Sequence, residues 1–163
     1  MLKNLCASMA VAAVLVAPSA GAAEYFVRVD GIPGTSTYRG MEDYVQVESW
    51  SFGFKEGVCQ GLTFVKTMDA SSAAFTVAAL SGVVYPFIVV VARKPGQQPF
   101  TFMRLTLNNA VFTSFTTGGT TNDGVPIEQI SAKPTSVKTE LFEQDIRGGK
   151  VVIANSRVDC PPT

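Results

Sequence analysis

From residue 24 onward, short runs of β-branched and aromatic residues alternate with clusters of Gly, Pro, Asn and Asp. Residues of the first kind fit a pleated backbone and those of the second kind favour turns, so the pattern predicts strands separated by loops. Seven or so strands and one helix predict a mainly β fold, either a small barrel or a sandwich with the helix plugging one side. The predicted strands cover residues 25–29, 44–54, 62–68, 86–93, 100–116, 125–130, 137–142 and 151–154, where 125–130 and 137–142 could also form one bent strand.

Two of these runs predict how strands are buried. Residues 86–93 are continuously apolar, which predicts burial on both faces, and the turn at 94–99 predicts a hairpin with 100–116. Residues 44–54 alternate with period two, which predicts one continuous strand. Its aromatic half, Trp50 to Phe54, is expected to face the core, and Gly53 suggests a bulge or a closely packed backbone.

A single convincing helix is predicted over residues 70–80. Asp69 is placed to cap its N-terminus, and Gly82 is placed to end it. The spacing predicts that Ala74, Val77, Ala78 and Leu80 face inward.

Residues 1–23 have the features of a secretory signal. Lys3 precedes an apolar run over 5–17, and small residues follow it where a signal peptidase cleaves. The run is shorter than the roughly 20 residues that a transmembrane helix needs. We therefore expect cleavage after Ala22 or Ala23 and export of a single domain over 24–163, to the periplasm or outside the cell. The alternative is a buried amphipathic N-terminal helix.

Two cysteines remain once Cys6 leaves with the signal. In an exported protein Cys59 and Cys160 are expected to form one disulfide that ties the C-terminal tail to a loop. Closing a loop of about 100 residues could stabilise the chain by up to roughly 4–5 kcal/mol in the chain-entropy model. Two free thiols, or a bond between subunits, are the alternatives.

The charge balance and the absence of histidine narrow the possible functions. Thirteen Lys and Arg residues balance 13 Asp and Glu, and losing Lys3 leaves the mature chain one negative charge in excess. No basic stripe is evident, which argues against nucleic-acid and membrane partners. Without histidine, Ser-His and Cys-His nucleophile pairs and His-containing zinc sites are excluded.

The remaining polar residues predict neither catalysis nor a cofactor. The glycine-rich loop at 118–124 lacks the spacing of a phosphate-binding loop and precedes no predicted helix. The acids are scattered over predicted caps, loops and solvent faces, without EF-hand spacing, so we expect no paired-carboxylate site and no metal site. The acids concerned are Asp69, Asp123, Glu128, Glu140, Glu143 and Asp145.

Several segments occur in an order that is shared with a known family. They are residues 26–34, 47–53, 61–72, 81–86, 93–94, 106–110 and 113–119. In this order they resemble the haemolysin-coregulated protein family (Hcp), the tube proteins of bacterial type VI secretion systems, over nearly the whole mature chain. These segments are structural signatures, and none is a catalytic motif.

The resemblance implies a two-sheet β-barrel with one flanking helix, which assembles into hexameric rings that stack into a hollow tube. It also implies a spike protein, a sheath and effectors as partners. The signal segment departs from the family, whose tube proteins have no cleavable signal, and residues 55–61 form a shorter loop than in many members. The alternative function is therefore an exported monomeric Hcp-like domain that binds a protein or a small ligand.

Overall fold

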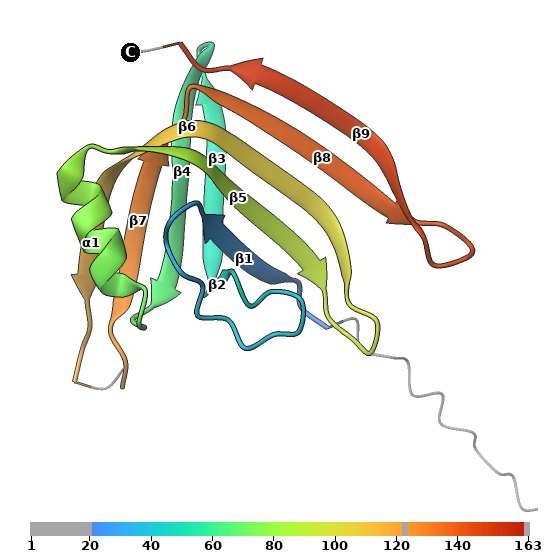
Figure 1. Ribbon diagram of the computed structural model, residues 1–163, viewed down its shortest axis with the longest axis horizontal. Helices are drawn as coiled ribbons and strands as arrows, with labels where there is room; N and C mark the ends of the chain where they lie inside the picture. The colour runs from blue at the N-terminus through green and yellow to red at the C-terminus, as the bar shows by residue number, and fades with distance from the viewer. Residues whose placement is uncertain (1–20, 122–123, 162–163) are drawn as a thin grey trace, which may run out of the picture.

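The computed structural model describes residues 21–121 and 124–161 (Figure 1). Nearly all of the predicted signal segment therefore lies outside the described residues. Within them the chain forms nine antiparallel strands and one helix, which confirms the mainly β fold. The elements are β1 (Glu24–Val29), β2 (Val45–Val47), β3 (Ser49–Lys55), β4 (Val58–Thr67), α1 (Ser72–Ser81), β5 (Val84–Lys94), β6 (Phe100–Gly118), β7 (Ile127–Lys133), β8 (Ser136–Gln144) and β9 (Lys150–Asp159).

The strands form one connected sheet that bends into two layers. Their order is β2-β1-β5-β6-β7-β4-β3, and β8 with β9 branches from β6. The 19-residue β6 serves both layers, because residues 103–108 pair with β8 and residues 111–118 pair with β7. Asn109 lies between these stretches with a φ of 46°, a left-handed conformation that Asn tolerates better than most residues. The two sheets that the family resemblance implied are thus two layers joined by the curved β6 (Figure 1).

The segment predicted as one strand over 44–54 is two strands in different layers, so that prediction was wrong. β2 pairs with β1, whereas β3 pairs with β4. Between them Glu48 donates its backbone N–H to the carbonyl oxygen of Val65 (2.8 Å), which brings the two ends of the sheet together. The chain turns there, so the inward positions change from odd to even numbers.

The burial of this segment follows from the same turn. Val45 and Val47 are buried before it, and Trp50 and Phe52 pack against the core after it, as expected for the aromatic half. Phe54, which was also expected to face the core, is 52% exposed, so that prediction was wrong; the strand register shifts between Gly53 and Phe54. The bulge suggested by Gly53 is therefore present.

The core lies between the two layers and under α1. Phe75 of the helix is fully buried, and its ring meets the edges of Phe64 and Phe112 at centroid distances of 5.6 Å each. Ala78 is buried beside it and Ala74 is partly buried. The predicted inward positions Val77 and Leu80 were wrong, since they are 65% and 84% exposed. The helix contacts the barrel along a narrow stripe set by Phe75, which the sequence analysis missed.

The ends of the helix agree in part with expectation. Gly82 ends α1 in the left-handed conformation, as predicted. The helix begins at Ser72, two residues later than predicted, because the Asp69 carboxylate accepts hydrogen bonds from the backbone N–H and the hydroxyl of Ser71. No helix in the described ranges is long and apolar enough to span a membrane.

The hairpin of β8 and β9 forms an arm that extends from the barrel (Figure 1). β8 is held through its pairing with β6, but β9 pairs only with β8. All ten residues of β9 are exposed, although residues 151–154 form an apolar run. The arm therefore has an apolar sequence without the burial that such a sequence predicts.

Candidate assembly surface

The predicted acids lie in three places. Asp69 and Glu128, which we expected to be scattered, meet on the same amine, that of Lys66. Glu140 lies on β8 and is paired with Lys138. Glu143 and Asp145 are exposed near the turn between β8 and β9, and Asp123 lies outside the described residues. Within the described ranges, no group of three or more acids, cysteines or histidines is arranged to hold a metal ion.

The Lys66 cluster is a buried ion network at the start of α1. Lys66 Nζ lies 2.7 Å from Glu128 Oε2 and 2.9 Å from Asp69 Oδ1, and the side chains of Lys66 and Glu128 are fully buried. Ser72 donates its hydroxyl to the same Glu128 oxygen (2.9 Å). The single ammonium group contacts both carboxylates and, together with the Ser72 hydroxyl, joins β4, β7 and the start of the helix.

The protonation of Asp69 reflects two opposing effects. Burial alone would raise its pKa, but hydrogen bonds from Ser71, Thr35 and Lys66 outweigh burial and hold the pKa of Asp69 below its ordinary value. The Thr35 hydroxyl donates to Asp69 Oδ2 at 2.6 Å. The ionised carboxylate therefore ties the loop after β1 to the start of α1.

The sequence itself carries a signal of this cluster. Lys66 follows Leu62 and Phe64 at alternate positions of one strand, and Glu128 precedes Ile130 and Ala132 in the same way. Alternate positions share one face of a strand, so both charges had to lie on the core face. Their pairing across 62 residues of sequence is a matter of strand order and was not readable locally.

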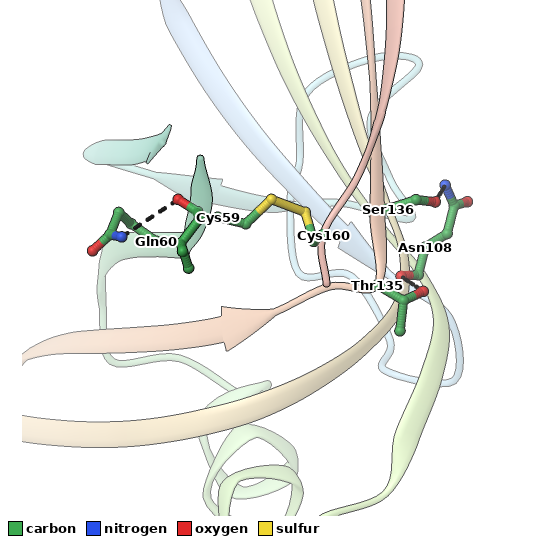
Figure 2. Close-up of a disulfide and its surroundings, with 7 residues drawn as sticks. Cys59, Gln60, Asn108, Thr135, Ser136 and Cys160 are labelled. Atoms are coloured by element: carbon green, nitrogen blue, oxygen red, sulfur yellow. Dashed lines mark hydrogen bonds between the residues drawn. A yellow bond between two sulfur atoms is a disulfide. The ribbon is translucent and has the colours of Figure 1, made fainter. Parts of the chain in front are cut away.

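The structure joins Cys59 of β4 to Cys160, the residue after β9 (Figure 2). The two Cα atoms are 5.5 Å apart, and both cysteines are buried. Cys160 also donates its backbone N–H to the carbonyl oxygen of Thr135 (2.7 Å). The end of β9 is thus fixed at the base of the arm, against the barrel.

One face of the arm is apolar and uncovered. Leu141 of β8 lies opposite Ala154, and Val158 of β9 lies opposite the buried Val137, so these residues share the face that lines the core further along. Leu141 is 38% exposed and Val158 is 41% exposed. We call this set, Leu141, Ala154 and Val158, the arm apolar face. It continues the core side of the sheet beyond the area that the barrel covers.

A second apolar patch lies at the C-terminal end of α1, where Val77, Leu80, Val83 and Val84 are all more than half exposed. Figure 1 shows the helix and the arm on opposite sides of the barrel. Single exposed apolar residues are common on protein surfaces, whereas grouped ones mark interaction sites. The molecule therefore offers two different apolar surfaces, one on the arm and one at the end of the helix.

Comparisons with known proteins agree with this architecture. Residues 26–140 match the family model described as type VI secretion system effector, Hcp. No curated protein sequence gives a significant match.

Solved structures are similar over nearly their whole length. The structure of Hcp1 from Salmonella typhimurium superposes with a TM-score of 0.74 at 22% identity, covering 85% of this chain and 95% of that one. A type VI secretion system effector from Yersinia pestis gives 0.71 at 19% identity, covering 83% and 98%. The secreted protein Hcp3 from Pseudomonas aeruginosa gives 0.67 at 13% identity, covering 86% and 98%. At these identities the likeness establishes the fold, which is the one expected from the sequence.

Proposed function

Because the chain belongs to the Hcp family of type VI secretion system proteins, we propose that it is a structural subunit that self-assembles into hexameric rings, which stack into a hollow tube. The observation that carries this proposal is the arm apolar face, which continues the core side of the sheet without a covering layer. A second copy of the chain is the occupant we assign to it.

The position of the two apolar surfaces supports ring closure. A head-to-tail contact uses two different surfaces of each copy and closes into a ring when its rotation permits. The arm apolar face and the patch at the end of α1 are two such different surfaces, carried by elements on opposite sides of the barrel (Figure 1). By family membership, the further partners in this proposal are the spike protein, the sheath and effectors.

The place of action in this proposal is the periplasm or the exterior of the cell. Residues 1–23 carry the pattern of a secretory signal, and disulfides persist in oxidising compartments. The functional unit is then the single domain over residues 24–163. A tube subunit exported in this way would assemble after export and after its disulfide has formed.

The solution mass of residues 24–163, produced in the periplasm and measured by light scattering, tests the assembly. We expect the mass of six copies and ring-shaped particles in negative-stain images. Val158→Glu adds a charge to the arm apolar face and should shift the mass to that of one copy. The matched control is Asn155→Glu, which adds the same charge to the opposite face of the same strand and should leave the mass unchanged.

Two results would overturn the proposal. A monomeric wild-type protein over a wide concentration range would favour the exported monomeric binding domain. Rings that persist in Val158→Glu would show that another surface joins the subunits. Circular dichroism of each variant distinguishes lost assembly from lost folding.

A further inference from the structure

The sheet face opposite to the arm apolar face, over β6, β8 and β9, carries more cations than acids. It carries Arg104 from β6, Lys138 from β8, and Lys150 and Arg157 from β9, which we call the cationic face. Composition concealed this cluster, because the whole chain has equal numbers of basic and acidic residues and the four residues are far apart in the sequence.

Strand register places these side chains on one face. Lys138 lies directly opposite Arg157 on β9 and opposite Thr106 on β6. Two positions along, Arg104 lies opposite Glu140. Like charges that lie directly opposite each other destabilise a strand pair, so the Lys138 and Arg157 pairing costs folding stability.

Two of the cations converge on one ring. Lys150 Nζ lies 3.4 Å from the centroid of the Phe142 ring, and Arg104 Cζ lies 5.9 Å from the same centroid. Phe142 is buried, so the ring holds both cations in place without offering an exposed stacking surface. Burial and then the repulsion from Arg104 lower the pKa of Lys150, while Glu140 opposes this shift.

The acids near this face leave positive charge in excess. Glu140 is largely covered and is already paired with Lys138 at 2.9 Å. Asp159 lies at the end of β9, opposite Ser136. Among the described residues, the cationic face takes part in only one ion pair within 4 Å, which is Lys138–Glu140. Three of the four cations are thus available to an incoming anion.

The cationic face borders a concavity. An open hollow of about 350 Å³ is lined by Arg104, Thr106 and Glu140 on one side and by Arg28 and Phe87 on the other. Arg28 is in the same cross-strand row as Lys138 and Arg157, since the row runs through Val89 and Thr106. A bound chain could therefore follow the row across five strands.

We propose that the cationic face docks an acidic polypeptide segment of a partner protein, with its Asp and Glu carboxylates on Arg104, Lys150 and Arg157. Guanidinium groups bind carboxylates through paired hydrogen bonds, which suits Arg104 and Arg157. Single-stranded nucleic acid, which binds by stacking bases on exposed aromatic rings, is less favoured on the arm, because the Phe142 ring there is buried beneath its cations. This inference goes beyond the proposed function and does not require ring formation, because the two faces of the arm are separate.

The binding of a fluorescein-labelled decapeptide of glutamate and serine, followed by anisotropy, tests the proposal. We expect saturable binding that weakens at least tenfold in Arg104→Gln/Arg157→Gln and weakens as salt is raised. The matched control is Lys55→Gln/Lys133→Gln, which removes the same charge from exposed positions on β3 and β7 and should bind as the wild type does. A lysine and serine decapeptide should not bind.

Several outcomes would overturn this assignment. Equal loss of binding in both double variants would mean that only net charge matters. Tighter binding of a ten-nucleotide single-stranded DNA than of the acidic peptide would point to nucleic acid. A changed solution mass in Arg104→Gln/Arg157→Gln would assign the cations to contacts between copies. A failure of ring assembly in the wild type would leave the peptide measurement fully interpretable.

Discussion

The barrel and the β8–β9 arm are built from the same kind of strand but are stabilised differently. Each barrel strand buries at least part of one face against the other layer or α1, whereas every residue of β9 is exposed. Backbone hydrogen bonds set the register in both regions, but the burial of apolar surface supplies most of the stability of a fold. The arm therefore depends on two anchors, its pairing with β6 and the disulfide at its base.

The largest effect is expected from Phe75→Ala, which removes the fully buried ring through which α1 packs on the core. Loss of its burial and the cavity left behind should lower the free energy of unfolding by about 3–5 kcal/mol. Urea denaturation followed by the fluorescence of Trp50 measures this. Leu80→Ala on the exposed side of the same helix is the control, with an expected change within about 0.5 kcal/mol. Equal losses in both variants would contradict the placement of the helix.

The double variant Cys59→Ser/Cys160→Ser tests the anchor of the arm. We expect the free energy of unfolding to fall by about 2–4 kcal/mol. We also expect the amides of β9 to exchange with deuterium faster, while those of β4 change less, because β9 has no second attachment to the barrel. The wild type in reductant should behave in the same way. Unchanged exchange in β9 would show that pairing with β8 is sufficient.

The pH dependence of the free energy of unfolding tests the Lys66 ion network, which belongs to the barrel and not to the arm. The pKa of Asp69 is lowered by folding, so its contribution is present above the unfolded pKa and is lost as pH falls from about 5 through the folded value. Asp69→Asn should therefore lose roughly 1 kcal/mol at pH 7, a modest amount because solvent screens this partly exposed group. The deficit should vanish in acid.

Thermal unfolding of the wild type and of Asp69→Asn from pH 3 to pH 7 measures how the difference in their stability depends on pH. Glu143→Gln, an exposed position on the arm, is the control for the loss of one carboxylate. A deficit in Asp69→Asn that stays constant across this range would contradict the assigned linkage.

The smallest effect on stability is expected at the arm apolar face. Val158→Ser should change the free energy of unfolding of the single subunit by no more than about 0.5 kcal/mol, since the side chain is already partly exposed. A loss of more than about 1.5 kcal/mol, the scale of burying a valine, would show that the arm is covered within the subunit. Urea denaturation at low protein concentration measures it.

Local sequence patterns predicted secondary structure correctly where the conformational preferences of neighbouring residues are enough to determine it. The strand over 25–29, the hairpin after residues 86–93 and the end of α1 at Gly82 were all predicted, because β-branched runs and turn residues act within a few positions. The same patterns failed over 44–54, where the chain changes layer at Glu48, since no local signal marks which strand will be the partner.

Burial was the quantity that sequence could not provide. Residues 151–154 form an apolar run, yet all four are exposed on β9. Hydropathy measures what a side chain would gain by leaving water, but a second layer has to be present to cover it. The arm apolar face and the apolar patch at the end of α1 consist of side chains that no second layer covers. Neither surface was therefore predicted from the sequence.

The sequence by itself determined a mainly β chain with one helix, the two cysteines placed for one bond, and the segments that resemble the Hcp family. The tertiary structure decided that Lys66 meets Glu128, that four cations share one sheet face over β6, β8 and β9, and that the arm apolar face on the opposite side is not covered. The physical reason is range: propensity acts between neighbours in the chain, whereas charge and apolar surface act between residues that only strand order brings together.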